Sequence, residues 1–187
     1  MVTTSRSTLS TAEERRETVI ASAIEVFGAS GYSSTPISAV AEHARISTAY
    51  VFKLFPGKET LFVAALDRCF DRIEEALELG AAASAGPSPA EILYAMGDAY
   101  ADLIADRSLL MLQVHAQSAA SVPEIGAALR RGLARVTRFA KTRSGAPDDD
   151  VQRFIAFGQL CHLIVTTGID GDSSDWARIV TAGIRHP

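Results

Sequence analysis

Apolar residues recur three and four positions apart along most of the chain, which is typical of amphipathic helices. Near the N-terminus, for example, Val19, Ile20, Ala23, Ile24 and Phe27 fall on one helix face. Hydroxyl residues, prolines and glycines separate these periodic stretches. We therefore predict an all-α chain of about nine helices and no strand. The expected helices cover about residues 11 to 28–32, 37–43, 48–54, 58–83, 89–106, 108–117, 123–142, 148–167 and 174–184.

Helix starts are marked by local capping signals. The segments 11–14, 88–91 and 121–124 each place a hydroxyl residue three positions before a glutamate, which is the capping-box pattern. Thr35 followed by Pro36 predicts a cap and then a proline at the first helical position. Ser47 is expected to cap the next helix.

The size and composition fit a globular protein of one domain, or of two small domains that share a core. The chain has 187 residues, of which 48% are hydrophobic and 21% charged. The two cysteines, Cys69 and Cys161, stand among apolar residues, so they predict neither a disulfide scaffold nor a metal site. We see no signal peptide and no apolar run long enough to cross a membrane, and we expect a cytoplasmic protein.

The segment 37–54 is the most informative part of the chain. It predicts two short helices joined by a tight turn, which is the requirement for a helix-turn-helix. Such short helices need apolar anchors to stay folded. The anchors that we expect are Ile37, Val40, Ala41, Ile46, Val51, Phe52 and Phe55. The outer side of the second helix carries small or polar residues, as a helix in the major groove requires.

Local charge supports this reading although the net charge of the whole chain is −4. Residues 43–58 contain Arg45, Lys53 and Lys58 and no carboxylate, so their charges sum to +3. Positive charge is therefore concentrated where DNA phosphates would lie.

These same residues carry a resemblance to a known family. The run FGASGYSSTPISAVA at 27–41 and the run ISTAYVFKLFPGKETL at 46–61 resemble the DNA-binding domain of TetR-family transcriptional regulators. The resemblance covers about residues 12–65. It implies a homodimer that binds double-stranded DNA and is released by a small-molecule effector, with no cofactor. It also implies a DNA-binding domain at 11–56 and an effector-binding and dimerisation domain at 57–187. Residues 1–10 are polar and rich in serine and threonine, so we expect a flexible tail there.

The resemblance assigns DNA contacts to one group of residues: Thr35, Arg45, Ser47, Thr48, Ala49, Tyr50, Lys53 and Lys58. Three positions depart from the family pattern. Arg45 stands where glycine is usual, Phe52 replaces a phosphate-binding tyrosine, and Leu54 replaces a histidine. Glycine is usual there because the turn can require a left-handed backbone, so Arg45 would either cost about 1–2 kcal/mol in that conformation or accompany a different turn.

Two further groups are candidates for function in the C-terminal part. The apolar arc of the helix at 148–167 is wide, which indicates contact both with the subunit core and with a partner subunit, although a fully buried helix would show the same arc. The expected dimer residues are Val151, Phe154, Ile155, Gly158, His162 and Val165. Core packing is the ordinary role of a second group, which could instead line an effector cavity: Met96, Tyr100, Leu103, Met111, Leu112, His115, Phe157 and Trp176.

No arrangement of residues predicts catalysis or a metal site. There is no glycine-rich phosphate loop and no strained serine motif, and His115 and His162 read as interior histidines. We therefore expect a ligand-responsive regulator, most simply a repressor, and not an enzyme. The alternative is a helical sensor or interaction module whose DNA-binding part has degenerated, as the departures at Arg45 and Phe52 and the acidic net charge would allow.

Overall fold

A computed structural model describes the backbone of residues 4–185 and the side chains from residue 11 to residue 185. Within this part the chain forms nine α-helices, one short 3-10 helix and no strand, so the predicted all-α fold is confirmed. The helices are α1 Thr4–Ser34, α2 Ile37–His43, α3 Thr48–Leu54, α4 Lys58–Ala82, α5 Pro89–Ile104, α6 Arg107–Ser118, α7 Pro123–Ser144, α8 Asp148–Thr167 and α9 Asp175–Thr181, with the 3-10 helix η1 at Ile169–Gly171.

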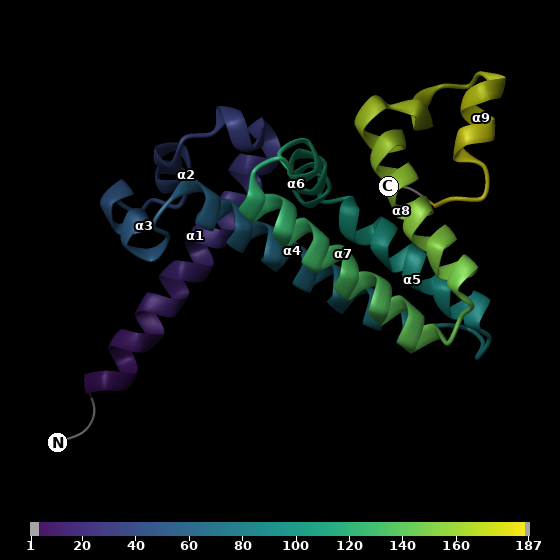
Figure 1. Cartoon of the computed structure of the whole chain (residues 1–187), viewed down its shortest axis with the longest axis horizontal. Helices are drawn as coiled ribbons and strands as arrows, with labels where there is room; N and C mark the ends of the chain where they lie inside the picture. Colours follow the sequence, from purple (N-terminus) through teal and green to yellow (C-terminus); the bar gives the residue numbers. More distant parts are fainter. Residues whose placement is uncertain (1–3, 186–187) are drawn as a thin grey trace.

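The helices form a head and a body that lie end to end (Figure 1). We call α1 to α3 the head and α4 to α9 the body. In the body α4, α5 and α7 run side by side, and α8 and α9 lie at the end farthest from the head. None of the described helices is both long and apolar enough to cross a bilayer.

The first helix begins earlier than predicted. Residues 4–10 belong to α1, although the sequence predicts a flexible tail at 1–10, and residues 1–3 lie outside the described part. The run from Thr4 to Ser10 contains no glycine or proline that would stop a helix from extending toward the N-terminus. Thr11 therefore lies inside α1, and the prediction that it caps the helix is wrong. Toward its C-terminal end α1 kinks at Gly31, where φ is 77°.

Two of the other predicted caps are confirmed and two are wrong. The Ser47 hydroxyl accepts a hydrogen bond from the Tyr50 backbone, and Ser88 forms a complete capping box with Glu91. Helix α2 instead takes Pro36 as its N-cap residue, and α7 takes Val122, so neither Thr35 nor Ser121 caps a helix. In both cases the hydroxyl residue lies one position too far upstream of the first helical residue.

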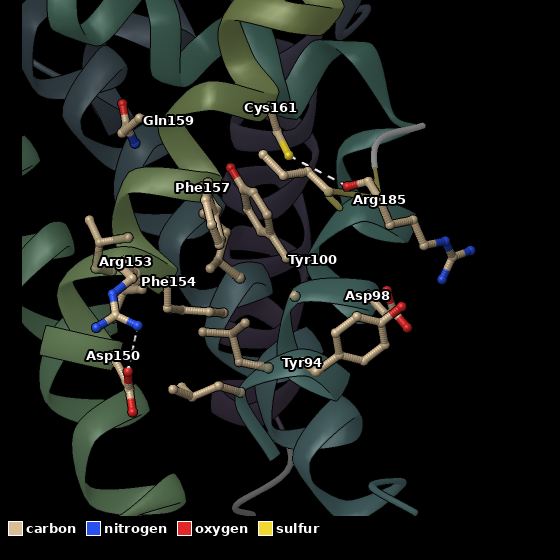
Figure 2. A pocket seen from close by; sticks show the side chains of 18 of the residues that line it. Tyr94, Asp98, Tyr100, Asp150, Arg153, Phe154, Phe157, Gln159, Cys161 and Arg185 are labelled. Carbon is tan, nitrogen blue, oxygen red and sulfur yellow. Dashed lines mark hydrogen bonds and ion pairs between the residues drawn. The ribbon is translucent and has the colours of Figure 1, made fainter. Parts of the chain in front are cut away.

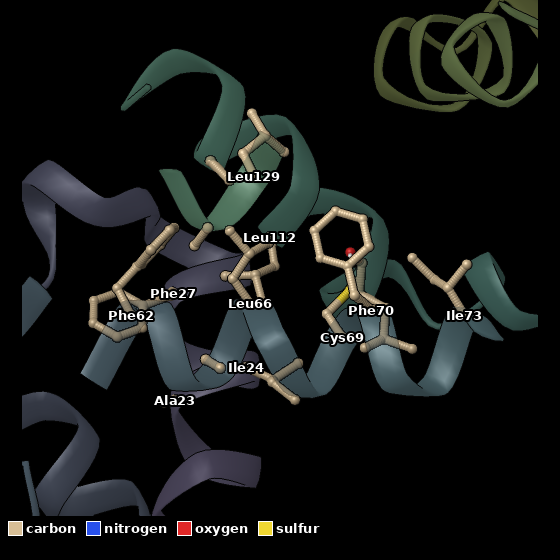
Figure 3. Packing of buried hydrophobic residues seen from close by; sticks show 14 of the residues in the cluster. Ala23, Ile24, Phe27, Phe62, Leu66, Cys69, Phe70, Ile73, Leu112 and Leu129 are labelled. Carbon is tan, nitrogen blue, oxygen red and sulfur yellow. Dashed lines mark hydrogen bonds between the residues drawn. The ribbon is translucent and has the colours of Figure 1, made fainter. Parts of the chain in front are cut away.

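Helix α4 carries the core that joins head and body (Figure 3). Near its start Phe62 packs edge-to-face on Phe27 of α1, with ring centroids 5.0 Å apart. Two turns further on Phe70 packs over Gly132 of α7, where a Cβ atom would lie 2.1 Å from the Phe70 ring. The buried residues of the head and most of those of the body belong to one continuous apolar cluster.

The turn between α2 and α3 contains a strained residue. Arg45 has φ of 56°, and it is the only residue other than glycine with positive φ among the described residues. The backbone on either side is tied back to α2, because the amides of Arg45 and Ile46 donate to the carbonyls of Glu42 and Ala41. The turn therefore keeps a left-handed conformation in spite of the arginine, at a cost of about 1–2 kcal/mol.

Replacing Arg45 with glycine should stabilise the protein. Glycine adopts the left-handed region without strain, and its larger unfolded-state entropy offsets part of the gain. We expect Arg45→Gly to raise the free energy of unfolding by about 0.5–1 kcal/mol, measured by urea denaturation. Arg45→Ala is the matched control, since it removes the guanidinium but keeps a side chain at the strained position. An equal gain in Arg45→Ala would show that charge, and not backbone strain, is responsible.

Candidate functional site

The helix-turn-helix is braced as the sequence predicts, with one exception. Ile37, Val40 and Ala41 of α2 are buried, as are Val51 of α3 and the Phe55 that follows it. The exception is Phe52, whose side chain is 49% exposed, so its prediction as an anchor is wrong. Val51 and Phe55 are four residues apart and set the inward face of α3, and Phe52 lies about 100° away from Val51 around the helix.

The outward face of α3 is therefore formed by Ala49, Phe52 and Lys53, all of which are exposed. Their spacing of three and four residues places them on one side of the helix. Thr48 and Tyr50 flank this face and are partly buried. No carboxylate stands on α3. The structure thus exposes a short, acid-free helix with one cation and one large apolar ring.

Cations from the neighbouring helix add to this surface. The Arg15 guanidinium of α1 lies over the Tyr50 ring, 5.5 Å from its centroid, and Lys53 lies over the same ring at 6.0 Å. Arg16 stacks on Phe55 at 4.4 Å. Sequence reasoning did not find the two α1 arginines, because they lie about 35 residues before the rings on which they stack.

Two residues predicted to contact DNA have internal partners. The Thr35 hydroxyl is buried and donates to the Gly31 carbonyl at 2.7 Å, so it is not free to meet a phosphate. The Lys58 ammonium donates to the Ser33 carbonyl at 3.3 Å and lies 4.5 Å from the Tyr32 ring centroid. Arg45, in contrast, is exposed.

Three of the five arginines of α7 are engaged with acidic residues of α4. Arg135 forms hydrogen-bonded ion pairs with Asp71 and Glu74, both at 2.8 Å. Arg131 and Arg143 pair with further α4 carboxylates. The charge of these three arginines is therefore neutralised within the body.

A second candidate site lies inside the body, between α4, α5, α7 and α8 (Figure 2). It is a cavity of about 320 Å³, at the lower end of the range of about 300–1,000 Å³ for small-molecule sites. Most of its wall is apolar. The apolar side chains in the lining include Phe70, Ile73, Leu77, Leu93, Leu133, Val136, Phe154 and Ile155.

Of the eight residues predicted for an effector cavity, only Tyr100 and Phe157 line it. Met96 and Leu112 are completely buried in the core, and the Trp176 side chain is 53% exposed. Leu103, Met111 and His115 are also absent from the lining. The helical period identifies the inward faces of helices, but it does not show where packing between those faces leaves a void.

The predicted dimer face of α8 is turned inward, and that prediction is wrong. Phe154, Ile155 and Gly158 line the cavity. Val151 and His162 are buried, and Val165 packs on the small cluster formed by Ile104, Leu110 and Cys161. The apolar arc of α8 is wide, as predicted, but the residues expected to meet a partner subunit instead face α5 and α6 of the same subunit.

Sequence reasoning also failed to place two glycines in the cavity wall, since it named Gly158 only as a dimer residue and did not single out Gly97. A Cβ atom on Gly97 of α5 would lie 4.0 Å from the Phe154 ring, and one on Gly158 would lie 3.8 Å from the Tyr100 ring. Both are ordinary contact distances. The two glycines therefore leave space in the cavity and do not serve as sites of close helix approach. A lone glycine within a helical pattern was the only available signal.

A chain of hydrogen bonds ties three helices together at the cavity. The Tyr100 hydroxyl of α5 lies 2.7 Å from Nε2 of His162 on α8 and 3.3 Å from Oε1 of Gln113 on α6. Gln113 in turn donates to the Leu109 carbonyl at 3.2 Å. Burial lowers the pKa of His162 to about 4 and raises the pKa of Tyr100 well above its usual value. Both groups are therefore neutral at pH 7, and His162 is the interior histidine that the sequence predicts, with Nδ1 left without a partner.

Comparison with known proteins gives both an N-terminal and a whole-chain match. Residues 19–65 match the family model for bacterial regulatory proteins of the tetR family. The transcriptional repressor KstR of Mycolicibacterium smegmatis is 32% identical over 74 residues, which cover 40% of this chain and 36% of the repressor. The matched part thus spans about a third of the length of the curated relatives.

Solved structures match over most of the chain. The regulator FadR of Bacillus subtilis, solved in complex with stearoyl-CoA, aligns with a TM-score of 0.67 at 16% identity, covering 90% of this chain and 99% of FadR. A TetR-family regulator from Agrobacterium tumefaciens aligns with a TM-score of 0.69 at 14% identity, covering 91% and 94% of the two chains. At these identities the likeness concerns the fold alone.

The buried neutral His162 predicts a loss of stability in mild acid. As the pH falls below 6.5 the histidine of the unfolded chain takes up a proton, while the folded chain does not until about pH 4. The free energy of unfolding should therefore drop by roughly 2 kcal/mol between pH 7 and pH 5 from this residue.

Urea denaturation at several pH values would measure this loss. His162→Gln keeps an amide that can meet the Tyr100 hydroxyl, and it should flatten the slope in that window. His43→Gln, at an exposed position, is the control and should leave the slope in place. An unchanged slope in His162→Gln would contradict the assignment.

Proposed function

We propose that the protein is a cytoplasmic, dimeric transcriptional repressor, on the premise that residues 19–65 match the family model for bacterial regulatory proteins of the tetR family. In this proposal the head, with a boundary near residues 56 and 57, binds double-stranded operator DNA. The body binds a second copy of the chain and a small-molecule effector. Occupation of the cavity releases the DNA.

The observation that carries the proposal is the outward face of α3. Its exposed residues Ala49, Phe52 and Lys53 are free of acid, and the buried Val51 and Phe55 hold the helix from behind. A helix of this kind fits the major groove, where an aromatic or methyl group meets a thymine methyl and a cation meets a phosphate. The arginines at positions 15, 16 and 45 extend the positive surface beside it.

Dimerisation is supported by apolar side chains left exposed at the far end of the body. On α8 Leu163 is 51% exposed, and on α9 Trp176 and Ile179 are 53% and 77% exposed. Apolar residues gathered on two consecutive helices are typical of a surface that is covered in an assembly. Two copies joined there would present two α3 helices to successive turns of the duplex, about 34 Å apart or a multiple of it.

Effector control is supported by the way the cavity connects to the head. Phe70 and Ile73 of α4 line the cavity, and Phe62 of the same helix packs on α1. Gln113 of α6 also lines the cavity, and the His115 ring of α6 packs against Gly31 at the kink of α1. A ligand that prefers one arrangement of α4 and α6 therefore biases the position of the head, typically by about 1–3 kcal/mol.

The DNA proposal is tested by electrophoretic mobility shift against the DNA upstream of the protein's own gene. Lys53→Ala should weaken binding to all DNA sequences about equally and reduce the salt slope by roughly one unit, because it removes one phosphate contact. Phe52→Ala should weaken binding mainly to the preferred sequence, because it removes an apolar contact with a base.

Arg138→Ala is the matched control for Lys53→Ala. Arg138 is an exposed cation on α7, away from α3, and its loss should leave DNA binding unchanged. A folded dimer that binds no DNA at low salt would instead favour the alternative of a sensor with a degenerate head. The missing hydroxyl at Phe52 and the net charge of −4 are the observations that favour this alternative.

The dimer proposal is tested by analytical ultracentrifugation. Ile179→Arg places a charge in the exposed apolar surface of α9 and should convert dimers to monomers, because an unpaired charge would be buried at the interface. Leu79→Arg is the matched control, since Leu79 of α4 is 71% exposed and lies outside this surface. Dimers that persist in Ile179→Arg would place the interface elsewhere.

A further inference from the structure

Among the described residues that line the cavity, no positive charge is unpaired. Two arginines stand in its lining, Arg153 and Arg185, and both are exposed at the edge. Arg153 pairs with Asp150 at 3.0 Å, as Figure 2 shows, and Arg185 pairs with Asp102. Each arginine has a carboxylate partner beside it, so the two pairs offer an anion little net positive charge. The remaining charged residue of the lining, Asp98, is a carboxylate and repels anions.

The interior of the cavity is also uncharged. Its polar groups deep in the wall are the Tyr100 hydroxyl and the Gln113 amide, both part of the hydrogen-bonded chain to His162. The proton arrangement that leaves the fewest buried donors unsatisfied is the following. The Nε2–H of His162 donates to the Tyr100 hydroxyl, and the Tyr100 hydroxyl donates to Oε1 of Gln113. The buried Nδ1 of His162 is then a bare lone pair, and no N–H is left unsatisfied. Every group of the chain is neutral.

We infer that the cavity binds an uncharged, mainly apolar molecule of the size of two or three aromatic rings, and that it rejects anions of the same shape. The apolar wall supplies the affinity, and the absence of a free cation supplies the selectivity, because a buried anion without a partner is strongly disfavoured. This inference rests on the proposed function only in calling that molecule the effector, since binding to the cavity can be measured without DNA.

Two fluorescent probes that differ by one charge test the selectivity. N-phenyl-1-naphthylamine is neutral, and 8-anilinonaphthalene-1-sulfonate has the same rings with an added sulfonate. Both become brighter when they leave water for an apolar site. Titration of the full chain should show the neutral probe binding at least about tenfold more tightly than the sulfonate, which corresponds to about 1.4 kcal/mol.

Variants that fill the cavity locate the binding site. Gly158→Leu and Gly97→Leu place a side chain in the void from opposite walls, at positions where a Cβ atom meets only ordinary contacts. Each should weaken binding of the neutral probe at least about tenfold, or about 1.4 kcal/mol, with helix content by circular dichroism unchanged. Leu79→Ser removes an exposed apolar side chain outside the lining and should leave the affinity unchanged.

The possible outcomes separate this inference from the proposed function. The inferred preference for neutral ligands would be overturned if the sulfonate probe bound as tightly as the neutral probe, or more tightly, and lost this binding in the two cavity variants. Binding of the neutral probe that survives in folded forms of both cavity variants would place it outside the cavity and overturn the site. Either result leaves DNA binding by the head untouched, and failure to bind DNA leaves the probe result standing.

Discussion

The structure depends on one helix, α4, whose apolar stripe is shared by the two candidate sites. Its first turns bury Phe62 between Phe27 and Tyr32 of α1, with ring centroids at 5.0 and 5.3 Å. Its later turns place Phe70 and Ile73 in the wall of the cavity. Because interiors are densely packed and transmit strain, we expect a shift of α4 at one end to be felt by the residues packed at its other end.

Helix α6 provides a second, shorter connection. Gly28 of α1 lies against the backbone of α6 so closely that a Cβ atom would be 2.6 Å from the Ser108 carbonyl oxygen. The Ser108 hydroxyl donates to the Glu25 carboxylate at 2.6 Å. On its other side α6 offers Gln113 to the hydrogen-bonded chain of the cavity. The same helix is thus in contact with the head through its backbone and with the cavity through a polar side chain.

The sequence allowed the helices and the head to be predicted well, but not the faces of the body. Capping signals such as those at Ser47 and Ser88 act within one turn of helix, so α3 and α5 begin where they are expected. At Arg45 the sequence left two alternatives open, a strained left-handed turn or a different turn, and the structure has the first. Phe154 and Gly158 point inward because of where α5 lies relative to α8. The residue pattern of α8 alone cannot predict that position. The outward direction of Phe52 follows from Val51 and Phe55 only once those two are known to be buried.

The shared core also determines which parts of the protein can work alone. The short helices α2 and α3 have seven residues each, and they are stable only while packed on α1 and α4. Since α1 rests on α4 and α6, the head relies on the body for much of its own burial. A DNA-binding head cut from this body would lose that support. The head therefore depends on its contacts with α4 and α6 for stability. An occupied cavity would act on the position of α3 through these same contacts.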